Sequence, residues 1–137
     1  MRRRLSLVLC LPLSALAVSA CGSTVSTAGF KGAQHQVAQT VANLQSHATA
    51  AEEKKICGED LAAAVVRRLG GTGGCEAAIK RQLAEVDSLE VSVGSVHIAA
   101  GGTSATAGVA SIYEGKSRAS TITLVKEGGK WRISKLG

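Results

Sequence analysis

The spacing of apolar residues changes near residue 91, and this change limits the folds that the 137-residue chain can adopt. Before it, apolar side chains recur every three or four residues, as at Val37, Val41 and Leu44, which is the period of an amphipathic helix. After it, apolar and polar residues alternate, and short glycine-containing turns separate the runs. The order predicts an α+β fold, with N-terminal helices packed on a bent four-stranded antiparallel meander sheet.

The first half of the domain is expected to contain four helices, over residues 34–47, 50–57 and 61–69 and from Cys75 onward. Thr49 and Glu52 have the spacing of a capping box for the second helix. Asp60 is placed to cap the third helix, which glycines at 70 and 71 end. Local sequence thus assigns each of these polar residues to a helix terminus.

The second half is expected to contain four strands, beginning at Val91 and covering 105–113, 120–126 and 130–136. Gly108 inside the second run predicts a bulge that bends the sheet. His97 alternates with Val96 and Ile98, so it faces solvent if those two face the core. Tyr113 shares the parity of the apolar positions in its run and is a candidate to line the interior, either as packing or at a cavity.

Residues 1–20 have the pattern of a signal peptide: a basic start, an apolar run from Leu5 to Val18, and then small residues. The apolar run is shorter than the roughly 20 residues that a membrane-spanning helix needs. The sequence Val-Ser-Ala-Cys that ends at Cys21 resembles the bacterial lipobox, in which the cysteine thiol receives diacylglycerol. The alternatives are an ordinary signal in which Cys21 is incidental, or an uncleaved anchor.

Cleavage at this motif divides the chain into a signal peptide (1–20), the lipidated Cys21 with a Gly-, Ser- and Thr-rich tether (21–33), and an α+β domain (34–137). Acyl chains contribute about 0.8 kcal/mol per buried methylene, so two or three of them hold a protein firmly on a bilayer. We therefore expect a lipid anchor on the extracytoplasmic face of the cell membrane, with membrane lipid as one partner.

The net charge argues against nucleic-acid binding. Lys plus Arg falls from 16 to 13 when Arg2, Arg3 and Arg4 leave with the leader, and against 10 acidic residues this gives a net charge of +3. The basic residues are scattered among acidic ones, and no stripe of Lys and Arg is interleaved with aromatics.

Two cysteines remain in the domain after Cys10 leaves with the leader and Cys21 is acylated. Cys75 lies on the apolar face of its helix, and Cys57 precedes the next apolar position by one turn. Export favours a disulfide between them, which would add roughly 3 kcal/mol by loop entropy. Two free buried cysteines are the alternative. Zinc would need two further ligands that no local spacing supplies, so we predict no metal and no cofactor.

The chain resembles the nuclear transport factor 2-like superfamily, a cystatin-like α+β cone, and within it the small exported lipoproteins of actinobacteria. The residues that carry the resemblance are the helix Val37–His47, the pair Cys57 and Cys75, and the terminal hairpin Val125–Ile133 with its Gly-Lys-Trp-x-Ile ending. The resemblance spans most of residues 34–137. It implies a cone that holds a ligand or isomerase and dehydratase chemistry in some members, and a non-catalytic binding or assembly module in many others.

The favoured function is a non-catalytic binding or accessory module of the cell envelope, with an envelope protein or a small hydrophobic ligand as partner. Trp131 shares parity with Ile133 and is expected to close the core, the alternative being an exposed anchor for a partner. Together with Tyr113 and His97 it is a possible cavity or partner contact.

The alternative function is a small-molecule enzyme that uses the cone. Its candidate acids and bases are His47, Asp87, Glu90, His97 and Tyr113. No pair among them has a spacing that requires catalysis, so no catalytic residue is assigned. A structural spacer with a filled core is a third possibility.

Overall fold

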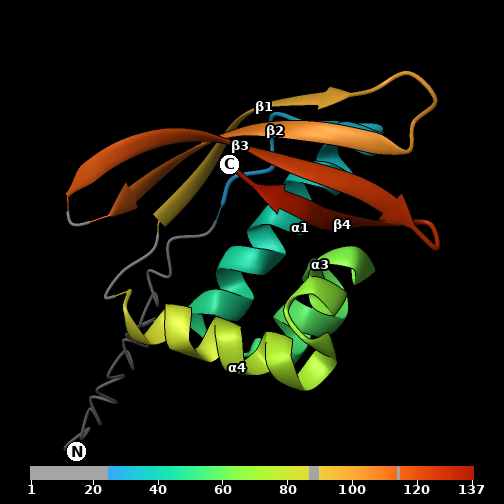
Figure 1. The fold of residues 1–137 in the computed structure, drawn as a ribbon. Coiled ribbons are helices and arrows are strands. Elements are labelled where there is room, and N and C mark those ends of the chain that lie inside the picture. Colours follow the sequence, from blue (N-terminus) through green and yellow to red (C-terminus); the bar gives the residue numbers. More distant parts are fainter. Residues whose placement is uncertain (1–24, 87–89, 114) are drawn as a thin grey trace, which may run out of the picture.

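A computed structural model of the protein describes residues 25–86, 90–113 and 115–137. The signal peptide at 1–20 and Cys21 lie outside the described residues. Within them, helices cover one face of a single curved sheet (Figure 1).

The helical elements are α1 (Gly32–Thr49), α2 (Glu53–Lys55), the π-helical turn η1 (Ile56–Asp60), α3 (Ala63–Arg68) and α4 (Gly71–Ala84). The strands are β1 (Glu90–Ile98), β2 (Ser104–Tyr113), β3 (Lys116–Glu127) and β4 (Lys130–Leu136). All neighbouring strands are antiparallel and follow the order β1-β2-β3-β4. The predicted α+β fold with a four-stranded meander is confirmed.

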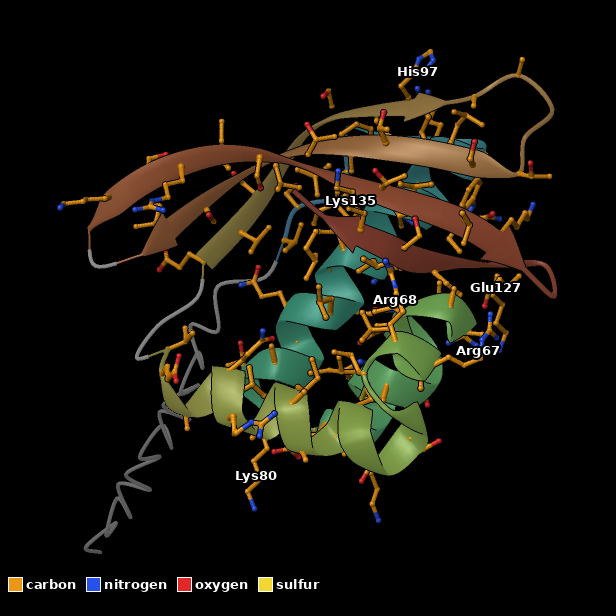
Figure 2. All side chains as sticks on the ribbon, viewed as in Figure 1. Arg67, Arg68, Lys80, His97, Glu127 and Lys135 are labelled. Atoms are coloured by element: carbon orange, nitrogen blue, oxygen red, sulfur yellow. A yellow bond between two sulfur atoms is a disulfide. The ribbon has the colours of Figure 1, made fainter. Side chains whose placement is uncertain are left out.

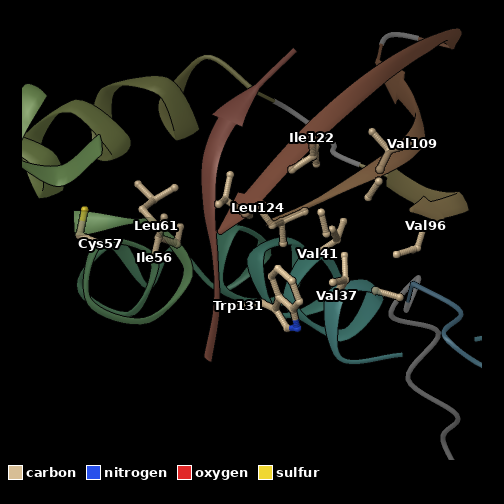
Figure 3. Close-up of a cluster of buried hydrophobic side chains, with 14 of the residues drawn as sticks. Val37, Val41, Ile56, Cys57, Leu61, Val96, Val109, Ile122, Leu124 and Trp131 are labelled. Atoms are coloured by element: carbon tan, nitrogen blue, oxygen red, sulfur yellow. The ribbon is translucent and has the colours of Figure 1, made fainter. Parts of the chain in front are cut away.

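The core lies between α1 and the inner face of the sheet. Val37 and Val41 of α1 are buried against strand residues such as Leu124 (Figure 3). The buried residues of β3 and β4 alternate with less buried ones, as the period of two requires. The inner face is filled by Val96, Ala105, Ala107, Val109, Ile122, Leu124, Trp131 and Ile133.

Two glutamine side chains tie α1 to the edge strand β1. The Gln34 side-chain amide donates a hydrogen bond to the Val96 carbonyl, at 3.1 Å. The Val91 backbone N–H donates to the Gln45 side-chain oxygen, also at 3.1 Å. Backbone groups on an unpaired sheet edge otherwise offer a template for aggregation, so these bonds both orient the helix and cover part of the edge.

The bulge that bends the sheet lies in β1 and not at Gly108 as predicted. The register shifts between Val93 and Ser95, which leaves Gly94 as the extra residue, while Gly108 keeps a regular partner in Ser95. A side chain at Gly108 would meet the Ser95 hydroxyl. The glycine in β2 therefore permits a close approach between strands and does not itself form the bulge.

The helix caps also differ from the predictions. The Thr49 hydroxyl donates to the Gln45 carbonyl inside α1, at 2.9 Å, so it does not cap the next helix. Asp60 lies in η1, and α3 begins three residues later, where the Ala63 N–H donates to the Glu127 carboxylate at 3.2 and 3.3 Å. A carboxylate at a helix start is favourable, and here a distant strand supplies it.

The fourth helix begins at Gly71, four residues before the predicted start at Cys75. Its glycines allow a close approach to α3. A side chain at Gly74 would coincide with the Leu69 carbonyl oxygen, whereas Gly73 has open space around it. The glycine-rich segment is therefore helical, and one glycine in it is required by packing.

The structure pairs Cys57 of η1 with Cys75 of α4 in a disulfide, across a sequence separation of 18 and a Cα–Cα distance of 6.1 Å. Both residues are buried. Since α4 packs against α2, η1 and α3, the disulfide fastens the outer helix to the layer that contacts the sheet.

Replacing both cysteines with serine should lower the free energy of unfolding by roughly 3 kcal/mol, because the unfolded chain regains the freedom of the closed loop. Denaturant unfolding of the oxidised wild type and the double variant measures the difference. Reductant should lower the wild-type stability to the level of the variant and leave the variant unchanged. A wild type that is insensitive to reductant would contradict the disulfide.

Gly74→Ala and Gly73→Ala should change the free energy of unfolding in opposite directions, although the two residues are adjacent. Alanine is a better helix former than glycine by up to about 1 kcal/mol, so Gly73→Ala should stabilise the domain. Gly74→Ala should destabilise it by about 1–3 kcal/mol, because the backbone of α3 must shift. Thermal unfolding of both variants tests the packing of α3 on α4, and equal effects would show it to be wrong.

Candidate functional site

A groove of about 370 Å³ lies between α1, η1 and the hairpin that joins β3 to β4. This volume falls within the range of roughly 300–1,000 Å³ that is usual for small-molecule sites. Most of the residues that line it are polar or charged, and their polar and apolar atoms share its wall about equally. The lining includes Gln36, Gln39, Asn43, Glu59, Asp60, Lys130, Trp131 and Arg132. We call it the α1–β4 groove.

The wall that α1 contributes is a row of side-chain amides. Gln36, Gln39 and Asn43 are spaced by three and four residues, so they share one side of the helix, next to the buried stripe of Val37 and Val41. The Gln39 amide nitrogen donates to the Asn43 side-chain oxygen at 3.0 Å. This bond fixes both amides along the groove.

Trp131 brings an unsatisfied donor to the groove. Its side chain is 5% exposed, and its indole nitrogen is buried without an acceptor among the described residues. The nitrogen end of the ring points away from Leu124 and the rest of the apolar cluster (Figure 3). The Lys126 ammonium lies 5.7 Å from the ring centroid. A buried donor without a partner costs about 1–3 kcal/mol and requires an explanation.

Asp60 forms a buried pair with His47 at the inner end of the groove. The His47 Nδ1 atom lies 2.7 Å from an Asp60 carboxylate oxygen, and the side chains are 15% and 3% exposed. Burial raises the pKa of the Asp60 carboxyl group, and the hydrogen bond and charge of His47 act against that rise. The nearby Arg132 also lowers this pKa, whereas the charge of Glu59 raises it further.

Arg132 also closes the groove at β4, because its guanidinium donates to the Gly58 carbonyl of η1 at 2.8 Å. A backbone hydrogen bond joins the same segments: the Ala62 N–H, between η1 and α3, donates to the Ile133 carbonyl of β4 at 2.8 Å. The groove is therefore built by three elements that are hydrogen-bonded to one another, and its shape depends on the position of η1.

The structure does not bring most of the sequence-predicted candidates together. Exposed His97 points outward from the sheet, away from the helices (Figure 2). Tyr113 ends β2, but its side chain and the whole of Asp87 lie outside the described residues, and Glu90 is an exposed residue at the start of β1. Trp131 is the predicted contact that lines the groove.

The sequence analysis missed the pair of His47 and Asp60. Asp60 was assigned to a helix cap and His47 to no pair, because a separation of 13 residues across a chain reversal has no local signature. The one signal in the sequence was the position of Asp60 three residues after Cys57, a cysteine expected to be buried. Within the described ranges, no group of three His, Cys, Asp or Glu residues could hold a metal ion, and no helix has the length and apolarity to cross a membrane.

Comparisons with known proteins identify the fold but no family. No family model matches the chain, and no curated protein does. The intermembrane-space region of the chloroplast protein ARC6 is similar, with 14% identity and a TM-score of 0.50, over 79% of this chain and 97% of that one. At this identity the similarity concerns the fold alone.

Two designed proteins are also similar. One is of the nuclear transport factor 2-like type, with 15% identity and a TM-score of 0.48, over 74% of this chain and 95% of that one. The other has a curved β-sheet, with 20% identity and a TM-score of 0.38, and the match spans 48% of this chain and 61% of the designed one.

Asp60→Asn should change the pH dependence of stability. The pKa of Asp60 is raised in the folded state above its ordinary value of 3.8, so the folded protein binds this proton more tightly than the unfolded chain does. The wild type therefore loses stability as the pH rises from 3.8 through the raised pKa, and the amide variant lacks this loss. Urea unfolding across this range measures the difference between the two proteins.

That difference in unfolding free energy, wild type minus variant, should fall with rising pH. The charged neighbours that set its size are His47 of α1, Glu59 of η1 and Arg132 of β4. Glu76→Gln, on α4, serves as the control and should leave the slope unchanged. A difference that stays constant or grows with pH would show that burial does not dominate the pKa of the Asp60 carboxyl group.

Proposed function

We propose that this protein is a lipid-anchored extracytoplasmic lipoprotein whose nuclear transport factor 2-like domain is a non-catalytic binding module of the cell envelope. The leader and the lipobox-like motif at Cys21 support the anchor, and the resemblance of residues 34–137 to actinobacterial lipoproteins supports the envelope location. The observation that carries the binding function is the α1–β4 groove, whose lining residues are mostly polar or charged.

The polar wall of the groove favours a polar ligand. The sequence had suggested a small hydrophobic one, but the apolar side chains of the inner sheet face pack against α1, while the groove presents amides and charges. A groove lined by hydrogen-bonding groups favours ligands that can bond to them, because a ligand that displaces bound water must replace the bonds of that water. A pure spacer has no use for such a lining.

Catalysis is the second candidate, and the pair of His47 and Asp60 is the observation that favours it. Asp60 lines the groove and carries a raised pKa, which suits a general acid or base, and His47 orients its carboxylate. Against it, a reaction also needs a group that stabilises developing charge, and the nearest cation, Arg132, is bonded to the Gly58 carbonyl. Binding is therefore the better-supported function.

A thermal-shift screen tests the binding function with the full chain carrying Cys21→Ala. A library of cell-wall fragments, lipids and small polar metabolites should contain a ligand that raises the melting temperature. At 100 times its dissociation constant a ligand adds about 2.7 kcal/mol of stability, so a true hit is easily measured. Asn43→Ala, in the groove, should weaken the shift, and His97→Ala, on the outer face, should preserve it. Hits that survive Asn43→Ala would place the site elsewhere.

Cys21→Ala should release the protein from the membrane fraction, because acylation requires the thiol. Cys10→Ala is the matched control, since that cysteine leaves with the leader, and it should remain anchored. Fractionation of cells that express each variant, followed by immunoblotting, gives the distribution. Membrane association of the Cys21 variant equal to that of the control would rule out the lipid anchor.

A further inference from the structure

We infer that the domain docks on the anionic surface of the membrane through basic side chains at the rim where α3 meets β4. This contact is separate from the anchor at Cys21. The inference rests on the proposed lipid anchor, which holds the domain near the bilayer, and adds the side that the domain turns toward it. The basic side chains, which we call the basic rim, are those of Arg67, Arg68, Lys126, Lys130 and Lys135.

Folding separates charges that are mixed along the sequence. Together, α3 and residues 122–136, where β3 pairs with β4, carry six basic residues and one acidic residue, Glu127. The neighbouring elements α2, η1 and α4 carry four of each kind. The Glu127 carboxylate accepts the hydrogen bond of the Ala63 N–H, so the one acidic group on this side is already engaged. The excess positive charge of the domain is therefore gathered at α3 and β4.

The side chains of the basic rim are available to bind anions. All five are exposed, and within the described ranges none of them forms an ion pair. Arg68 donates only a long hydrogen bond, at 3.4 Å, to the Ser134 carbonyl, which places the end of α3 beside β4 (Figure 2). The sixth basic residue, Arg132, does not belong to the rim, because its guanidinium is bonded to the Gly58 carbonyl and lies near Asp60.

Two exposed leucines in the same elements favour a bilayer over a soluble acidic polymer. In the described part of the chain the exposed large apolar side chains are those of Leu69, Ile112 and Leu136. Leu69 follows Arg68 at the end of α3 and is 37% exposed, and Leu136 follows Lys135 at the end of β4 and is 58% exposed. Cations beside exposed apolar side chains are typical of membrane-surface binding, in which leucine enters the headgroup region while Lys and Arg meet lipid phosphates. A polyanion in water offers no such environment to a leucine.

The length of the tether keeps the domain within reach of the lipid headgroups. The chain is fixed to the domain from Thr27, whose carbonyl accepts a hydrogen bond from the Phe30 N–H at 3.1 Å and lies 3.3 Å from Nδ1 of His35. Residues 21–26 alone precede this point, and they span at most about 20 Å when fully extended. His35 and Lys130 line the same groove, so the tether joins the domain on the side that carries the rim. The anchor thus holds the rim where headgroup charge attracts it.

Paramagnetic relaxation tests this contact with the full chain as the cell makes it. The isotope-labelled protein is purified in detergent and reconstituted into nanodiscs of phosphatidylcholine alone, or of equal parts phosphatidylcholine and phosphatidylglycerol, each with a trace of gadolinium-chelating lipid. On the anionic discs the amide signals of α3 and β4 should broaden, and those of β1 around His97 should stay sharp. Neutral discs should not produce this selective broadening. Raising the salt from about 0.1 M to about 1 M should also remove it, because the screening length falls from about 10 Å to about 3 Å.

Two triple variants separate the position of the charges from their number. The rim variant combines Arg67→Gln, Arg68→Gln and Lys135→Gln, none of which lines the α1–β4 groove. The control variant removes as many charges from α2 and α4 and combines Lys54→Gln, Lys80→Gln and Arg81→Gln. Each basic residue at an anionic surface contributes about fivefold, the equivalent of about 1 kcal/mol. The rim variant should therefore lower the ratio of docked to undocked domain about a hundredfold, and the control variant should dock almost as the wild type does.

A second pair of variants tests the apolar part of the contact. Leu69→Ala combined with Leu136→Ala should weaken docking about tenfold, because the leucines no longer enter the headgroup region. Ile112→Ala, at the third exposed apolar side chain, lies in β2 and should leave docking unchanged. Thermal unfolding of every variant checks that the fold is retained.

The inference is overturned if the broadening is the same on neutral discs, is uniform over the domain, or falls equally in the two triple variants. If the rim signals respond to soluble polyphosphate but not to the discs, the occupant is an acidic polymer and the membrane contact is wrong. The anchor is judged separately, by fractionating Cys21→Ala after a high-salt wash that removes the rim contact. If that test rules out the anchor, the soluble chain is added to the same discs, and the same signals decide whether the rim binds.

Discussion

The packing of α1 across the inner face of the sheet is the contact on which the rest of the structure depends. The core contains a single large ring, that of Trp131, and is otherwise built from smaller side chains such as Val37 and Leu124. Small side chains bury little area each, so the helix must lie close to the sheet along its length. The side chains of Gln34 and Gln45 hold the helix in this position, because they bond to backbone groups that the edge strand β1 would otherwise leave unpaired.

Once α1 is in place, the segment from η1 to the start of α3 connects the remaining elements. Cys57 joins it to α4, Asp60 to α1 through His47, and the Gly58 carbonyl to β4. The parallel bridge between Leu61 and Ile133 adds a backbone contact with β4. A π-helical turn is uncommon and often occurs at functional sites. Here it presents a carboxylate to α1, a carbonyl to β4 and a disulfide sulfur to α4.

Local sequence was sufficient for features that depend on neighbouring residues. Alternation along the last strand predicted that Trp131 and Ile133 share the buried face, and the glycine turns predicted the order of the strands. It failed where the partner lies far along the chain. The α3 cap comes from Glu127, 64 residues after Ala63, and no local pattern identifies such an acceptor.

The candidate site was largely hidden from the sequence for the same reason. Parity placed Trp131 in the core but could not show that it would line one groove with the amides of α1, because that juxtaposition depends on the crossing of a helix and a strand almost 90 residues apart in the chain. Asp60 had a plausible local role as a cap, and only the return of η1 toward α1 pairs it with His47. Long-range pairing, not residue type, decides the chemistry of this groove.

The unpaired donor at Trp131 also bears on why the groove is polar at all. The indole ring supplies much of the aromatic area that this domain buries, and the cost of its unpaired N–H offsets part of that gain. The tryptophan, the buried carboxylate of Asp60 and the amides of Gln39 and Asn43 converge on one groove. The proposed binding function rests on this convergence of polar groups, which the packing of the core does not by itself require.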